Sequence, residues 1–145
     1  MTSSTEHHRK LEHMYGAAPI NTFFEPELAV SEGAAELIIT VREEFFHSAG
    51  AMHGVVYFKA LDDSTFFAAQ SLVPEYFVLT AHFELDLLKP VAYGSVRALA
   101  TVTKRSGRKL WANADLFDDD GDPVARGEGV FVISQQKLRP EIHYR

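Results

Sequence analysis

Several things are missing from this chain of 145 residues, and each absence narrows what it can be. It has no cysteine, which excludes disulfides, thiolate nucleophiles and cysteine-ligated metals. No apolar run approaches the ~20 residues that a bilayer requires, and the first residues lack the apolar core of a signal peptide. We therefore expect a cytoplasmic protein with no membrane partner.

Positive charge is also scarce. The chain has 14 Lys and Arg against 20 Asp and Glu, which gives a formal net charge of −6. Nucleic-acid binding domains show a basic face or stripe, so we expect no nucleic-acid partner. The length is enough to bury a core without disulfides or metals, and no repeat or linker divides it. We expect a single domain over residues 1–145.

The polar and apolar patterns predict most of the secondary structure. Residues 6–15 predict a short helix within an N-terminal helical segment, 1–18, and Phe23, Phe24 and Pro26 lead into a first strand. A turn at 31–33 separates that strand from another at 35–41. Tight turns join three further segments into an antiparallel meander that begins at Gly94, before a tail at 135–145. These segments are 94–102, 110–117 and 124–134.

A long half-buried strand is predicted from residue 78 to 87. Apolar and polar residues alternate strictly there, so one set should face the core and the other should face away, with Thr80 in the second set. The apolar set is Leu79, Ala81, Phe83, Leu85 and Leu87.

The segment 54–72 has a different pattern. It shows no alternation, is rich in Ala and Phe, and continues until Pro74, which is too long for an ordinary strand. Its apolar residues surround nearly the whole circumference of a helix, so we predict a helix buried on most sides. The fold class is therefore α+β, with an antiparallel sheet wrapped on one helix.

Two adjacent carboxylates, Asp62 and Asp63, interrupt this helix. Lys59 is four residues before Asp63, a spacing that permits a surface ion pair, so this stripe could simply be the solvent-exposed edge. His53 and Asp62 are nine residues apart, which in a helix means half a turn off and a climb of ~13.5 Å. They cannot act on the same atom unless a second copy supplies one of them.

Gly54 lies where the helix is predicted to begin. The free N–H groups and the positive dipole end of a first turn favour negative charge, and a glycine lets a ligand approach the backbone. A thioester oxygen that becomes an oxyanion would suit this position. The alternative is an ordinary glycine before a helix.

These features resemble the signature of the hotdog-fold acyl-CoA thioesterases, and most of all the PaaI-like (phenylacetate-pathway) subfamily. The signature residues are the run from His47 to Gly54, HSAGAMHG, with Asp62 nine residues after His53. The similarity continues through 87–91, Gly94 and 127–129, and covers roughly residues 20–134. It implies a hotdog fold, a long central helix wrapped by about five or six antiparallel strands.

The resemblance also implies an activity, the hydrolysis of an acyl-CoA thioester to a free acid and coenzyme A. Asp62 would be the general base or nucleophile, and His47 of the facing subunit would orient substrate or water. The Gly54 amide would hold the thioester oxygen, and Thr80 would help to position water. Further positions implied to bind substrate are His53, Val55 and Lys89.

The resemblance implies a homodimer, with the site shared across its interface, and a homotetramer of two dimers. Coenzyme A would be part of the substrate, and no separate cofactor is expected. The acyl group, aromatic or medium-chain, stays open, as does coenzyme A against an acyl-carrier protein. An alternative is a non-catalytic acyl-CoA sensor, although the terminus is too short for a helix-turn-helix.

Two positions depart from the family pattern. Val55 replaces the second glycine of a His-Gly-Gly motif, and its side chain could narrow the acyl pocket or reorient the oxyanion donor. The family helix often reads Leu-x-Asp, which would make Asp63 the acid. Ungapped counting from the His-Gly pair gives Asp62, and Asp63 is the fallback.

No metal site is predicted. None of the seven histidines has the spacing and nearby acid of a zinc helix. The acidic run 118–122 looks like a calcium loop, but with Gly121 as its sixth position the first and twelfth would be Leu116 and Gly127, which are not ligands. We predict a turn there.

Overall fold

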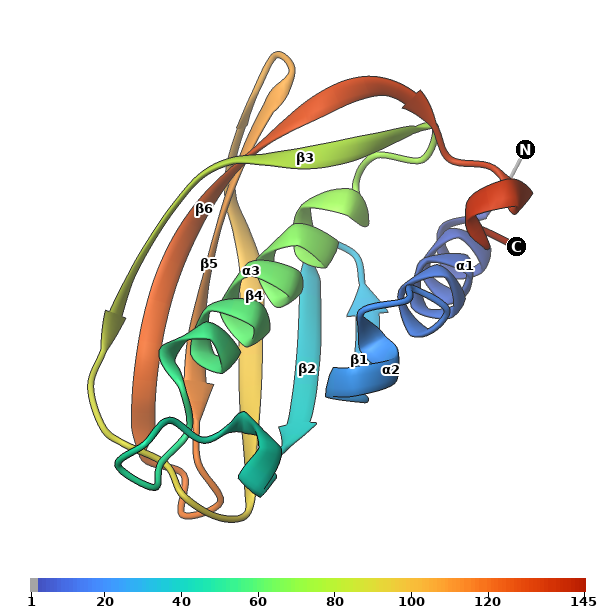
Figure 1. Cartoon of the computed structure of the whole chain (residues 1–145). Coiled ribbons are helices and arrows are strands. Elements are labelled where there is room, and N and C mark those ends of the chain that lie inside the picture. Colours follow the sequence, from blue (N-terminus) through green and yellow to red (C-terminus); the bar gives the residue numbers. More distant parts are fainter. Residues whose placement is uncertain (1–2) are drawn as a thin grey trace.

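The computed structural model describes residues 3–145 as an antiparallel sheet curved around one long helix (Figure 1). The six strands lie in the order β1-β2-β4-β5-β6-β3. Helix α3 (Gly54–Gln70) lies on the concave side of the sheet. This is the predicted hotdog fold. The strands are β1 (Glu27–Ser31), β2 (Ala34–Thr40), β3 (Tyr76–Leu87), β4 (Ser95–Ser106), β5 (Lys109–Phe117) and β6 (Pro123–Lys137).

Side-chain hydrogen bonds fix both ends of helix α3. At the start, His53 has extended backbone angles and its Nδ1 accepts the N–H of Val55 at 2.9 Å. At the other end, the fully buried Gln70 side chain donates to the carbonyl of Tyr76 and accepts the N–H of Val78. The helix therefore ends two residues before the predicted boundary, and Gln70 ties it to the start of β3.

Buried and more exposed residues alternate along much of β4 and β5, and the buried ones form the inner face of the sheet. The small buried side chains there let the sheet approach α3 closely; they are Ala98, Ala100, Ala112 and Ala114. On β6, a Cβ atom at Gly129 would lie 2.6 Å from the ring of Phe131 and 2.9 Å from that of Phe83. Only a glycine gives these two rings room.

The alternation predicted for β3 was wrong in the first half of the strand. Val78 is fully buried, whereas Leu79 is 52% exposed. The pairing with β6 shifts register between Thr80 and His82, and such a bulge adds one residue and reverses which side chains face the core. Thr80 consequently faces α3, as does Phe83 beyond the bulge.

The two edges of the sheet are covered differently. At the β1 edge lies α1 (Ser4–Gly16), which confirms the predicted N-terminal helix (Figure 1). A short helix, α2 (Asn21–Phe24), occupies the segment predicted only to lead into β1. At the opposite edge, β3 pairs with β6 on one side, and no other strand of residues 3–145 pairs with it.

The two chain ends pack together beside the end of α3 (Figure 1). The ring of His7 contacts the Tyr144 hydroxyl at 2.7 Å and the Gln70 carbonyl at 2.9 Å. Burial lowers the pKa of His7, so its neutral form is favoured. A 3₁₀ turn at Pro140–Ile142 directs the chain toward this contact.

Within residues 3–145, every helix is too short or too polar to cross a bilayer.

Candidate active site

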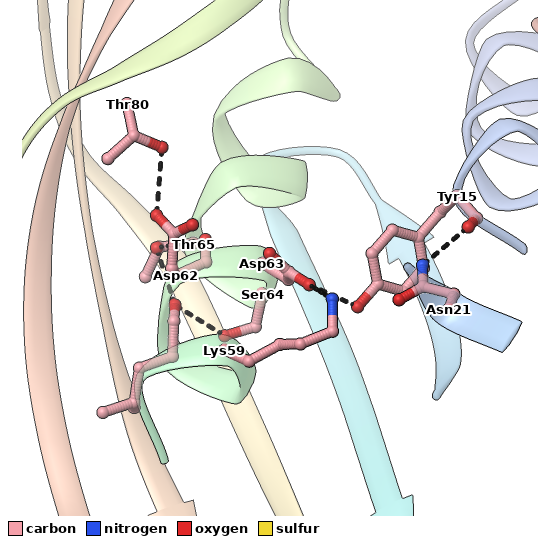
Figure 2. A network of polar contacts seen from close by, with 9 residues as sticks. Tyr15, Asn21, Lys59, Asp62, Asp63, Ser64, Thr65 and Thr80 are labelled. Atoms are coloured by element: carbon pink, nitrogen blue, oxygen red, sulfur yellow. Dashed lines mark hydrogen bonds and ion pairs between the residues drawn. The ribbon is translucent and has the colours of Figure 1, made fainter. Parts of the chain in front are cut away.

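Asp62 points from the middle of α3 toward β3 (Figure 2). The Thr80 hydroxyl donates to its Oδ1 at 3.0 Å. Burial, and next the negative charge of Asp63, raise the pKa of Asp62 to about 6, although the Thr80 hydrogen bond and Lys59 oppose this. Asp62 is therefore largely ionised at neutral pH and yet a stronger base than an ordinary aspartate.

Asp63 leaves the same helix in another direction, toward α1 (Figure 2). Its Oδ2 accepts the Tyr15 hydroxyl at 2.5 Å and the Lys59 ammonium at 2.6 Å. The predicted Lys59–Asp63 pair is present, but it is not a surface pair, because only 9% of the Lys59 side chain and 18% of the Asp63 side chain are exposed. The carboxylate of Asp63 is thus held by two donors on the side away from Thr80.

The first turn of α3 has one uncommitted donor. His53 takes two of the early N–H groups, that of Val55 on its Nδ1 and that of Val56 on its carbonyl. The N–H of Gly54 comes before any possible intrahelical acceptor and makes no hydrogen bond within residues 3–145. It is therefore available to an anion, and the half-exposed Val55 side chain lies next to it.

The two histidines of the signature are fixed by backbone contacts. His47 lies exposed in a tight turn, where its Nδ1 accepts the N–H of Ala49 at 3.0 Å. Because Nδ1 is an acceptor in both rings, the neutral forms of His47 and His53 carry their proton on Nε2. Neither ring hydrogen-bonds to Asp62 within residues 3–145.

One chain therefore holds two separate groups of candidate residues. Asp62 and Thr80 meet between α3 and β3, while the histidines lie with Gly54 at the start of α3. Large apolar side chains are exposed along the start of α3 and along β3 and the turn after it. They are Val55, Phe58, Leu79, Leu87 and Leu88.

Lys89 is bound to the acidic turn. Its Nζ lies 2.8 Å from Asp118 and 2.9 Å from Asp122, and these carboxylates raise the pKa of Lys89. The other oxygen of Asp118 accepts the backbone N–H groups of Asp120 and Asp122. Carboxylates of Asp118, Asp120 and Asp122 come close enough for a cation, but those of Asp118 and Asp122 are already paired with Lys89.

Two residues next to the site were missed by the sequence reasoning. Tyr15 contacts Asp63 across 48 positions of the chain, and no local pattern signals such a contact. The burial of Lys59 was also missed, although its spacing from Asp63 did signal the ion pair.

Comparisons with known proteins agree with this architecture. A family model described as "Thioesterase superfamily" matches residues 49–125. A Sulfurisphaera tokodaii protein named "Putative esterase" is 28% identical over 105 residues, 72% of this chain and 77% of that protein.

Two solved structures share the fold. The PaaI protein from the phenylacetic acid degradation operon of E. coli has a TM-score of 0.85 and 17% identity, covering 94% of this chain and 99% of that one. A mutant of the phenylacetic acid degradation protein PaaI from Thermus thermophilus has a TM-score of 0.74 and 19% identity, covering 81% of this chain and 100% of that one.

Proposed function

Because this chain belongs to the thioesterase superfamily, we propose that it hydrolyses an acyl-CoA thioester to a free acid and coenzyme A. The observation that carries the proposal is the partly buried carboxylate of Asp62, whose pKa is raised to about 6 and which is hydrogen-bonded to Thr80. Coenzyme A enters as part of the substrate, and no separate cofactor is needed. The proposed location is the cytoplasm.

The proposed reaction uses water as the nucleophile. Asp62 takes a proton from a water molecule that Thr80 helps to position, and the water oxygen attacks the thioester carbonyl. The carbonyl oxygen becomes an oxyanion and accepts the free N–H of Gly54. The C–S bond then breaks and the proton on Asp62 neutralises the leaving thiolate. A thiol ordinarily has a pKa of about 8.5, so no stronger acid is required.

Asp62 could instead act as the nucleophile. Its carboxylate would attack the carbonyl and displace the thiolate, leaving an acyl anhydride that water then hydrolyses. Label in the Asp62 side chain after a single turnover in ¹⁸O-labelled water would identify this route. Only the nucleophilic route can leave label in the Asp62 side chain.

The site is proposed to form between two copies of the chain. Within one chain, Asp62 lies ~12 Å along the axis of α3 from Gly54, so the two cannot share a substrate carbonyl. Gly54 and His47 of one copy would face Asp62 and Thr80 of the other. The unpaired edge of β3 and its exposed Leu79 support a homodimer, and a tetramer of two dimers is the further expectation.

The remaining substrate contacts are proposed around the start of α3. Val55 would flank the acyl group next to the oxyanion donor, since its side chain is half exposed there. His53, with Nε2–H free to donate, and Lys89 would contact the polar part of the substrate. The acyl pocket is then narrower than one with glycine at position 55.

A substrate panel tests the proposal. Thiol release should be followed with phenylacetyl-, benzoyl-, hexanoyl- and decanoyl-CoA and one acyl-carrier-protein thioester, beside dehydration of a 3-hydroxyacyl-CoA. We expect at least one acyl-CoA to be hydrolysed with kcat/KM of about 10⁴ M⁻¹s⁻¹ or more. Tight binding of acyl-CoA without thiol release would instead identify a sensor and contradict the proposal.

A further inference from the structure

A buried ionic cluster lies directly behind the proposed base. Lys59 and Asp63 on α3 and Tyr15 on α1 form this cluster, which we call the ion-pair network (Figure 2). The Lys59 ammonium lies 5.3 Å from the ring centre of Tyr15 and 5.0 Å from that of Phe24. Two helices thus form the network beside Asp62, and a ring of α2 packs against its ammonium group.

The network is rigidly built. The carbonyl of Tyr15 accepts the side-chain amide of Asn21 at 2.7 Å, which ties the end of α1 to α2. The Tyr15 ring also packs edge-on against Phe67, with 4.9 Å between ring centres. Burying an ion pair costs desolvation energy, and apolar residues often stabilise such a position as well or better. A role beyond stability is therefore reasonable for these charges.

We propose that Tyr15, Lys59 and Asp63 are positioning residues for Asp62. Tyr15 and Lys59 hold the Asp63 carboxylate in a fixed position directed away from β3, and the charge of Lys59 balances that of Asp63 beside Asp62. This leaves Asp62 as the one carboxylate of the adjacent pair that is free to take a proton. The role depends on the proposed function of Asp62 as the base. It also makes α1 part of the active site, although no α1 residue hydrogen-bonds to Asp62 within residues 3–145.

The charged groups around Asp62 shift its pKa in opposite directions. On its own helix, Asp63 raises and Lys59 lowers the pKa of Asp62. From α1, Tyr15 is a neutral donor, because burial and then Asp63 raise its pKa far above the ordinary value. From β3, Thr80 is also neutral and donates to Asp62. Within the network Asp63 and Lys59 offset each other, so removing either leaves the other acting alone.

Two variants with opposite expected shifts test the network. Lys59→Gln should raise the midpoint of the acidic limb of kcat/KM by about half to one pH unit, and Asp63→Asn should lower it by a similar amount. A purely structural role would not move the midpoint in opposite directions. Lys59→Arg keeps the charge and should keep the midpoint close to that of the wild type.

A second measurement keeps the test independent of turnover. The ¹³C carboxyl resonance of Asp62, assigned by its absence in Asp62→Asn, should titrate with the same shifts in each variant. If Asp63→Asn fails to fold, Lys59→Gln/Asp63→Asn should titrate below Lys59→Gln alone, since the double variant carries no buried charge in the network.

The two proposals can fail separately. If the wild type hydrolyses no thioester, the proposed function fails, and the carboxyl titrations still report on the network. If Lys59→Gln and Asp63→Asn shift the Asp62 titration in the same direction, or leave it unchanged within about 0.2 unit, the network has no such role and the inference is overturned.

Discussion

Helix α3 carries two adjacent carboxylates, and each faces a different edge of the sheet (Figure 2). At the β1 edge, α1 covers the strand and its Tyr15 donates to Asp63, which is also paired with Lys59. At the β3 edge, Asp62 has Thr80 as its partner and the strand is unpaired on its outer side within residues 3–145. A covered edge fixes one carboxylate in an ion pair, whereas the carboxylate near the open edge has a single neutral partner, which suits the role we propose for it.

Substituting each carboxylate in turn should give the largest difference between the two sides. Asp62→Asn should lower kcat/KM by about 100-fold or more, because a general base is lost. Asp63→Asn is the matched control, since it changes the neighbouring residue in the same way, and it should retain activity within about tenfold at pH 8. An inactive Asp63→Asn beside an active Asp62→Asn would show that Asp63 is the catalytic acid.

The open edge can be blocked by a charge at Leu79, which is 52% exposed on β3. Leu79→Asp should convert the dimer to monomer, because an unpaired charge on an edge strand opposes pairing with a second strand. Activity should fall with the dimer fraction, as measured by light scattering and thiol release. Leu99→Asp places the same charge at a 41% exposed position inside the sheet and should leave the dimer intact. Full activity of a monomeric Leu79→Asp would exclude a shared site.

The raised pKa of Asp62, the carboxylate near the open edge, should also make the stability of the protein depend on pH. The pKa of Asp62 is raised from 3.8 to about 6, so the folded state favours its neutral form. The stabilising contribution of protonated Asp62 is complete below about pH 4 and is lost as the pH rises through about 6. The asparagine side chain in Asp62→Asn cannot ionise. The free energy of unfolding of this variant should therefore exceed that of the wild type by about 1–2 kcal/mol at pH 8, allowing for the partial exposure of Asp62, and should equal it at pH 4.

Urea unfolding at both pH values measures this difference. A variant that is less stable than the wild type at pH 8 would mean that ionised Asp62 is favoured by its surroundings. Asp62 would then be a carboxylate that stabilises the fold through its contacts, as Asp63 is.

The smallest effect is expected at Lys89, beyond the end of β3. Its ammonium is already paired with Asp118 and Asp122 and is exposed, so a contact with substrate adds little. Lys89→Met should raise KM by about two- to fivefold and leave kcat unchanged. Lys104→Met, which removes another surface lysine on β4, should change neither. A fall in kcat for Lys89→Met would place Lys89 nearer to the chemistry than we propose.

Most of the fold could be predicted because its signals are local. The long, non-alternating and mostly apolar run from Gly54 predicted α3, and the tight turns that bound their segments predicted β4 and β5. The alternation of β3 misled because Leu79 is apolar yet faces outward on an unpaired edge. An exposed leucine in an alternating segment looks like a core residue in the sequence, so the alternation gave no sign of the bulge between Thr80 and His82.

In the candidate site, too, features set by local geometry could be predicted and those set by tertiary contacts could not. Helical spacing predicted that Asp62 and Gly54 lie far apart along one helix. The choice of Asp62 over Asp63 as the base came from the family resemblance and stays a prediction. The surroundings of Asp63 depend on α1, which meets α3 only through the tertiary fold. The contact between Tyr15 and Asp63 therefore had no sequence signal, and neither did the contact between His7 and Tyr144.

Subunit exchange between two inactive variants tests the shared site most directly. His47→Ala and Asp62→Asn are mixed in equal amounts under conditions that exchange subunits. Each mixed dimer then has one site with both lesions and one with neither, so about a quarter of wild-type activity should return. If His47→Ala alone proves active, Gly54→Leu replaces it as the partner. No recovery with either partner, despite proven exchange, would contradict a site built from Asp62 of one chain and Gly54 of the other.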